Sequence, residues 1–269
     1  MDAQQIDLGT GDIDFMQLPF NREFVQNNGI SAIHVEEQVK RSSQPIRMSG
    51  VKRSYQFDEE GNCTSRSSYR QRYGLTDTIF EAYRLSPDDN VLQYDRKDRG
   101  GFYRETFERS GDTLTICSYR GKSYELEATW ISCEHQVSRT TNSGDKTVIL
   151  NENHLPYKSR ERYFNSSGYL ERMVETYLIS MRSQEVTYQY NERGKLNFRR
   201  RLADKGNEEW SYVYSDDGLL AEVYYRVDGD LKWRRTIVQD DFGRIAAILT
   251  LDPGTEDITI DKFTYEFTE

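Results

Sequence analysis

The sequence predicts an all-β protein, a long antiparallel meander of about 18–20 strands that is curled or layered. Two observations predict this class. A phrase of strand and turn residues recurs at Tyr55–Gly61, Arg162–Gly168, Tyr188–Gly194 and Tyr212–Gly218. Turn signals rich in Gly, Asn and Asp also fall about every 12 residues, which leaves strands of ordinary length between them.

Residues 1–45 are expected to form an N-terminal cap segment and the first strand. Asn21 has the side chain of a helix N-cap, and Gly29 suits the position that follows a helix end at Asn28. The stretch Ile30–Val39 is typical of a strand. Because an open sheet edge invites pairing with another molecule, the cap segment is expected to cover one edge.

The recurring phrase has the chemistry of a tight turn, as the copy at Tyr188–Leu196 illustrates. The short polar side chain of Asn191 can bond the backbone two residues on, and Gly194 accepts a positive φ at little cost. Tyr190 and Leu196 flank the turn as cross-strand partners would, and such pairs fix the register of a hairpin.

The spacing of the phrase predicts hairpin repeats of roughly 24 residues. Turns at Gly144, Gly168, Gly194, Gly218 and Gly243 lie 24, 26, 24 and 25 residues apart. A β-propeller is the alternative architecture, and it would show a stronger period near about 48 residues.

Hydrophobic alternation supports the strand prediction. Trp210, Tyr212 and Tyr214 fall on one side of their stretch, so one face of the sheet is apolar. Other stretches, such as Ser65–Arg72 and Asn197–Arg201, place charges where the lipid band of a transmembrane barrel would have to be. The pattern therefore argues against a porin-like barrel.

The repeats resemble the YD repeats of bacterial RHS proteins. The shared pattern, aromatic-x-aromatic-(Asp/Asn)-x-x-Gly-x-(Leu/Ile), occurs at Tyr188–Leu196 and Tyr212–Leu220, and weaker copies extend over most of residues 46 to 267. The resemblance implies long curling sheets that serve as shells or surface scaffolds. On this basis residues 46–269 are predicted to be a YD-like β-hairpin repeat domain. The resemblance also implies an extracytoplasmic location, periplasmic or at the cell surface, with a cytoplasmic one as the alternative.

Composition limits the partners. Only 36% of the residues are hydrophobic, so the 19 Tyr, 12 Phe and 3 Trp are expected to supply a thin core. The net charge of −9 should repel nucleic acids and anionic membranes. No apolar run is long enough for a membrane-spanning helix, and no signal-peptide pattern is seen at the start. The one basic cluster, Lys195 with Arg199–Arg201, is expected on a solvated face, with its guanidinium groups stacked on Tyr rings.

Cysteine and histidine usage predicts neither a metal site nor a disulfide. Cys63, Cys117 and Cys133 show no zinc spacing, and a tight turn at Gly121 would place Cys117 opposite residue 126, too far from Cys133 to bridge. All three are expected to be small buried or half-buried residues. The three histidines have no ligand spacing, and the acidic turns match no calcium loop. We therefore assign no catalytic residue, metal ligand or cofactor.

Aromatic side chains form the candidate ligand-binding surface. Trp130, Trp210, Trp233, Tyr224 and Tyr225 could stack sugar rings if they face solvent in a groove; alternatively, these rings form the thin core. The resulting hypothesis is a non-catalytic secreted or envelope-associated β-repeat scaffold that binds a glycan or a protein. The alternative is a glycan-active hydrolase, which should show carboxylates with perturbed ionisation in a concave groove.

Overall fold

The computed structural model describes residues 20–268, except 73–74, 87–89, 123–128, 142–143 and 204–205. One short helix, α1 (Arg22–Asn27), precedes the strands. The first nine strands are β1 (Ile30–Lys40), β2 (Arg47–Phe57), β3 (Cys63–Arg72), β4 (Leu75–Leu85), β5 (Val91–Asp98), β6 (Gly101–Ser110), β7 (Thr113–Gly121), β8 (Thr129–Thr141) and β9 (Gly144–Leu150). The others are β10 (Pro156–Phe164), β11 (Leu170–Tyr177), β12 (Arg182–Tyr190), β13 (Leu196–Ala203), β14 (Gly206–Tyr214), β15 (Leu220–Val227), β16 (Asp230–Gln239), β17 (Ile245–Leu251) and β18 (Ile258–Phe267).

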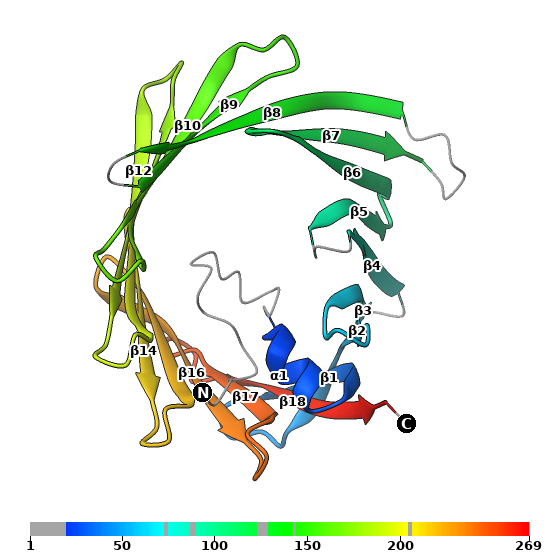
Figure 1. Ribbon diagram of the computed structural model, residues 1–269. Helices are drawn as coiled ribbons and strands as arrows, with labels where there is room; N and C mark the ends of the chain where they lie inside the picture. The colour runs from blue at the N-terminus through cyan, green and yellow to red at the C-terminus, as the bar shows by residue number, and fades with distance from the viewer. Residues whose placement is uncertain are drawn as a thin grey trace.

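The sheet closes into an 18-stranded antiparallel barrel in which each strand pairs with the next and β18 pairs with β1 (Figure 1). The all-β class, the meander and the strand number are therefore confirmed. The expected layered sheet and the propeller alternative are wrong, because the sheet curls until its two ends meet. The closing register runs from Ile30↔Phe267 to Lys40↔Ile258. Closure leaves no open edge, so the edge needs no separate cover.

The turns have the predicted geometry. Asn191 Oδ1 accepts hydrogen bonds from the backbone N–H groups of Arg193 and Lys195, each at 3.0 Å, and Gly194 has φ 73°. The same arrangement recurs at Asn151, where His154 takes the glycine position with φ 57°. This turn falls at one of the expected turn signals, although its copy of the phrase has no glycine.

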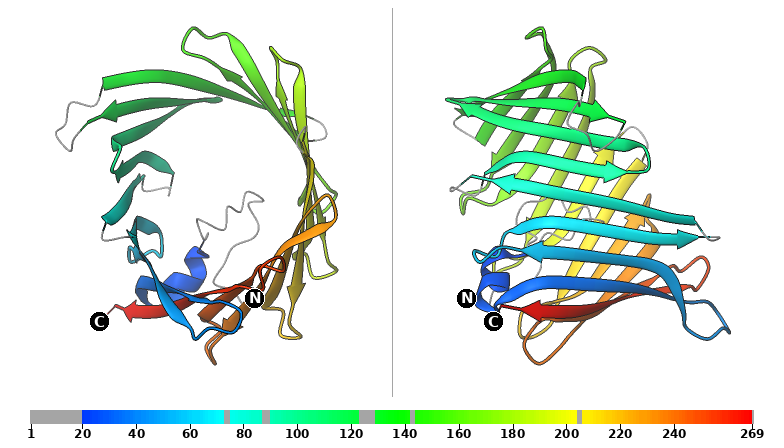
Figure 2. Two further views of the ribbon diagram at one scale, coloured as in Figure 1. Left: turned by 180° about the vertical axis from the view of Figure 1, so that it is seen from behind. Right: turned by 90° about the vertical axis from the view of Figure 1, so that its right-hand side faces the viewer.

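Helix α1 lies within the ring, near one end of the barrel (Figures 1 and 2). Asn21 caps it as predicted, accepting the Phe24 N–H at 3.0 Å, and Gly29 follows with φ 59°. Just before the helix, the ring of Phe20 packs edge-on against Tyr55, with centroids 4.9 Å apart. Tyr55 therefore marks the inner face of β2, and strand alternation with the register assigns the inner and outer faces of the other strands.

The apolar core fills the end of the barrel that holds α1. Val25, Ile33 and Val223 are fully buried there, and Tyr55 and Tyr212 are 2% and 4% exposed. Large aromatic side chains thus supply core volume, as the composition predicts.

The outer face carries cross-strand ion pairs. Lys146 lies 2.6 Å from Glu161, Arg104 lies 2.7 Å from Asp95, and Arg200 lies 3.1 Å from Glu209. These pairs make the outer face polar where they lie, whereas a lipid-facing band is apolar. Among the described residues, no helix is long and apolar enough to cross a membrane.

Two cysteines are joined, contrary to the sequence-based expectation. Cys117 on β7 and Cys133 on β8 are direct register partners and form a disulfide on the outer face. The prediction assumed a tight turn at Gly121, whereas β8 begins only at Thr129, so the longer connection shifts the register. Cys63 is half-buried with a free thiol, and burial raises its pKa to about 11.

Candidate functional site

Three of the five nominated aromatic residues form a stack on the inner wall. Trp210, Tyr225 and Trp233 lie on β14, β15 and β16 and are direct register partners. Their ring centroids are 5.0 and 5.2 Å apart in sequence order, so each ring packs on its neighbour across the strands. Both tryptophans also pack against the buried core cluster.

Guanidinium groups lie over both tryptophans. Arg199, the register partner of Trp210 on β13, lies 4.7 Å from its ring centroid, and Arg235 lies 4.4 Å from the ring of Trp233. We call these five residues the arginine–aromatic ladder. Because stacking occupies much of the ring faces and Arg199 is buried, we expect a ligand to reach the ladder at the ring edges and beside the half-buried Arg235. A stacked guanidinium keeps its N–H groups in its own plane, where they can donate to oxygen.

An ion pair continues the ladder along β13 and β14. Arg201 Nη2 lies 2.5 Å from Glu208 Oε2, and the two residues are register partners. Burial raises the pKa of Tyr225, and the negative charge of Glu208 raises it further. Tyr225 therefore keeps its phenolic proton at neutral pH.

The other two nominated residues lie on the outer face, away from the ladder. Trp130 on β8 is 51% exposed, and its indole nitrogen lies 3.3 Å from Cys133 Sγ. Tyr224 donates a hydrogen bond to Glu222, which also pairs with Arg234. Tyr224 and Tyr225 are adjacent on one strand and so face opposite sides of the sheet.

The prediction for the basic cluster, a solvated face with guanidinium groups stacked on Tyr rings, is only partly correct. Arg199 is 7% exposed, so it is buried and not solvated, and its ring partner is Trp210 instead of a tyrosine. Lys195 does lie over a tyrosine ring, that of Tyr214, at 5.5 Å. The contact between Arg199 and Trp210 could have been predicted from the register of the hairpin, which places the two residues opposite each other.

Several carboxylates on the inner wall are held by cationic or hydroxyl partners. Glu81 accepts the Tyr94 hydroxyl at 2.6 Å and lies 3.4 Å from Arg66. Glu175 is bound by Lys158 at 2.8 Å and by Arg160 at 2.7 Å. Such networks stabilise a sheet face and leave the carboxylates little freedom to exchange protons with a substrate.

One carboxylate pair differs from these. Glu37 and Asp261 are register partners on β1 and β18, and Arg53 Nη2 lies 3.2 Å from the first and 2.7 Å from the second. Burial raises the pKa of Asp261, and the charges of Arg53 and Arg235 only partly oppose this effect. Asp261 is therefore the inner-wall residue that bears on the hydrolase alternative.

The part of the chain that the structure describes contains no group of three or more His, Cys, Asp and Glu side chains that could hold a metal ion. His135 and His154 stack with centroids 4.3 Å apart, and His135 Nδ1 lies 3.0 Å from the Thr115 hydroxyl.

Comparisons with known proteins leave the family open. No family model matches the chain, and no curated protein matches it. A porin-like protein from Bacteroides uniformis ATCC 8492 aligns over 88% of this chain and 98% of its own, with 11% identity and a TM-score of 0.44. TcdB2-TccC3 without its hypervariable C-terminal region aligns over 77% of this chain and 14% of its own, with 9% identity and a TM-score of 0.25.

A LolA superfamily protein from Nitrosomonas europaea aligns over 92% of both chains, with 8% identity and a TM-score of 0.18. At TM-scores this low the similarities carry no functional argument. The likeness to the YD repeats of RHS proteins therefore stays a resemblance of the repeats.

Proposed function

We propose that this chain is a non-catalytic, envelope-associated barrel that binds a glycan on its inner wall, with the arginine–aromatic ladder as the contact surface. The ladder carries the proposal, because it sets stacked aromatic rings beside the positive charge of the half-buried Arg235 on the concave side of a closed sheet. Glycans present apolar C–H patches next to hydroxyl oxygens, which such a surface complements.

An extracytoplasmic location is part of the proposal. The Cys117–Cys133 disulfide supports it, because disulfides persist in oxidising compartments and are rare in the cytosol. The polar outer face fits a protein that is surrounded by water.

The test is a thermal-shift screen against oligosaccharides, followed by Trp210→Ala and Trp233→Ala. A ligand at a hundred times its Kd adds about 2.7 kcal/mol, which should raise the Tm by about 5 °C for a chain of this size. The shift, taken relative to each variant's own unliganded Tm, should vanish in both ladder variants.

Trp130→Ala is the matched control, because it removes the same side chain from the outer face. An equal shift in all three variants would overturn the ladder as the site. The absence of a shift with any glycan would overturn glycan binding and leave a protein partner as the ligand to pursue.

A second candidate function is a glycan hydrolase that uses Asp261. The raised pKa of Asp261, together with the facing carboxylate of Glu37, is the observation in its favour. Its test is the release of reducing ends from the same oligosaccharides. Activity that is lost in Asp261→Asn would establish this function in place of non-catalytic binding.

A further inference from the structure

The hairpin of β1 and β2 reaches the end of the barrel opposite α1 (Figure 2). The register between these strands shifts between Glu36 and Gln38, and Gly50 on β2 has φ 80°. A Cβ at Gly50 would lie 3.0 Å from the backbone oxygen of Gln71, so β2 and β3 approach closely there. A bulge and a close approach of this kind bend a hairpin and re-aim its side chains.

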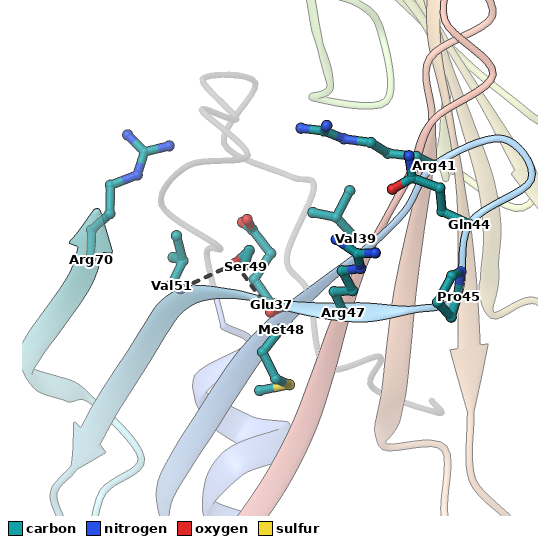
Figure 3. Close-up of a pocket in the computed structure, with 10 residues that line it drawn as sticks. All are labelled: Glu37, Val39, Arg41, Gln44, Pro45, Arg47, Met48, Ser49, Val51 and Arg70. Carbon is teal, nitrogen blue, oxygen red and sulfur yellow. Dashed lines mark hydrogen bonds between the residues drawn. The ribbon is translucent and has the colours of Figure 1, made fainter. Parts of the chain in front are cut away.

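The bent hairpin and β3 border an open cavity of about 520 Å³, shown with the 10 residues that line it in Figure 3. Ser49 fastens the bend: its hydroxyl donates to the Glu37 carbonyl and accepts the Val51 N–H, each at 3.1 Å. The cavity is therefore held by a specific cross-strand contact. It is separate from the ladder, which lies on β13 to β16.

Three arginines face this cavity. Arg47 is the register partner of Val39, and Arg70 is the register partner of Val51. Figure 3 shows Arg41, Arg47 and Arg70 on the same side of the sheet, with Met48 pointing away. Because Val51 shares a face with Tyr55, this is the inner side.

These three arginines are not held in close ion pairs with carboxylates, unlike several other arginines of the barrel. Asp77 on β4 is the register partner of Arg70, but among the described residues neither Arg47 nor Arg70 makes an ion pair or a side-chain hydrogen bond. Arg41 has only a long contact of 3.9 Å with Asp257. The one acidic residue that lines the cavity, Glu37, is engaged by Arg53. By contrast, Arg104 and Arg160 each lie 2.7 Å from a carboxylate oxygen.

We propose that this cavity, lined by Arg41, Arg47 and Arg70, binds a small acid through a phosphate, sulfate or carboxylate group. Guanidinium forks match the geometry of such oxyanions. The net charge of −9 does not prevent this, because screening over about 8 Å makes the three adjacent arginines outweigh distant carboxylates for an ion inside the cavity. The apolar side chains of Val39 and Val51 suit the body of the molecule that carries the anion.

The proposal is tested by isothermal titration calorimetry of the full chain with inorganic phosphate, sulfate and acetate at constant ionic strength. Phosphate or sulfate should bind with a Kd in the millimolar range or tighter, and acetate more weakly because it carries one charge. The double variant Arg47→Gln/Arg70→Gln should weaken binding by at least about tenfold, since each charged hydrogen bond contributes strongly.

Arg139→Gln is the matched control, since Arg139 is another exposed arginine but lies on β8, outside the cavity. It should leave the Kd unchanged. An equal loss in Arg139→Gln, or an unchanged Kd in the double variant, would overturn the site; so would heats that match a sodium chloride blank. None of these outcomes depends on glycan binding at the ladder.

Discussion

Replacing Glu175 by Gln should destabilise the barrel at neutral pH. Glu175 is 5% exposed on the inner face of β11 and binds Lys158, Arg160 and the Gln184 amide, the last at 2.6 Å. Gln keeps the size of the side chain but removes its charge, so two cations lose their counter-ion. Burial alone would raise the pKa of Glu175, yet the hydrogen bonds from Lys158 and Arg160 outweigh it and lower the pKa.

The magnitude follows from the exposure of the partners. Breaking a fully buried ion pair costs about 3–5 kcal/mol. Lys158 and Arg160 keep 16% and 33% of their side-chain surface in water, which reduces the penalty. We expect a loss of about 2 kcal/mol, which corresponds to a decrease in Tm of about 3–4 °C in a protein of this size.

The sign of the pH dependence follows from the lowered pKa. A carboxylate with a depressed folded-state pKa contributes stability above its unfolded pKa of about 4.3 and loses it as the pH falls through the folded value. The Tm difference between wild type and Glu175→Gln should therefore be full at pH 7 and shrink below about pH 4.3.

The assay is thermal unfolding followed by circular dichroism across this pH range. Glu185→Gln is the control, because Glu185 is 37% exposed and lies 3.6 Å from Arg172, so its loss should cost less than about 0.5 kcal/mol. A Tm difference that stays constant from pH 7 to pH 3, or an equal loss in Glu185→Gln, would refute the reasoning.

Three further predictions concern the turns and the thiols. Asn191→Ala should cost about 1 kcal/mol in urea unfolding, because two turn N–H groups lose their acceptor; an unchanged midpoint would contradict the turn geometry. Met181→Gly should raise the stability by about 0.5–1 kcal/mol, because glycine adopts the left-handed conformation of this position, φ 53°, at less cost than methionine. The Met181 side chain is 74% exposed, so its removal should cost little packing. A decrease in stability would show that the side chain packs. In the denatured, unreduced chain, iodoacetamide should label one thiol, that of Cys63. In the native chain the labelling should be slow, because burial raises the pKa of Cys63 to about 11. Three labelled residues by mass spectrometry would exclude the Cys117–Cys133 bond.

The elements that could be predicted from the sequence are those whose causes lie within a few residues. Asn21 caps α1 through the N–H of Phe24, and Asn191 closes its turn through the next few N–H groups. The closure of the barrel has no such local cause. It requires β1 to meet β18, more than 200 residues away, through curvature that adds up over every strand pair.

The candidate site likewise combines features with local causes and features that depend on distant parts of the chain. Alternation along β15 has a local cause, and it already places Tyr224 and Tyr225 on opposite faces of the sheet. The prediction that both belong to one ligand-binding surface did not take this into account. The ladder depends on registers across four strands, which set Arg199 opposite Trp210 and Tyr225 opposite Trp233. The arginine cavity depends on the bend at Gly50, which a glycine alone does not predict.

The polarity of the inner wall helps to distinguish residues that stabilise the barrel from residues that could bind a ligand. In a barrel whose apolar core is confined to the end that holds α1, the rest of the wall is stabilised by paired charges such as Arg53 with Asp261. Arginines in close ion pairs, such as Arg53 and Arg160, contribute to that stability. Arg47 and Arg70 make no ion pair among the described residues, although Asp77 faces Arg70 across the strands, and both line a cavity. Stability does not require them there, so replacing them should change anion binding and leave the Tm of the free protein nearly unchanged.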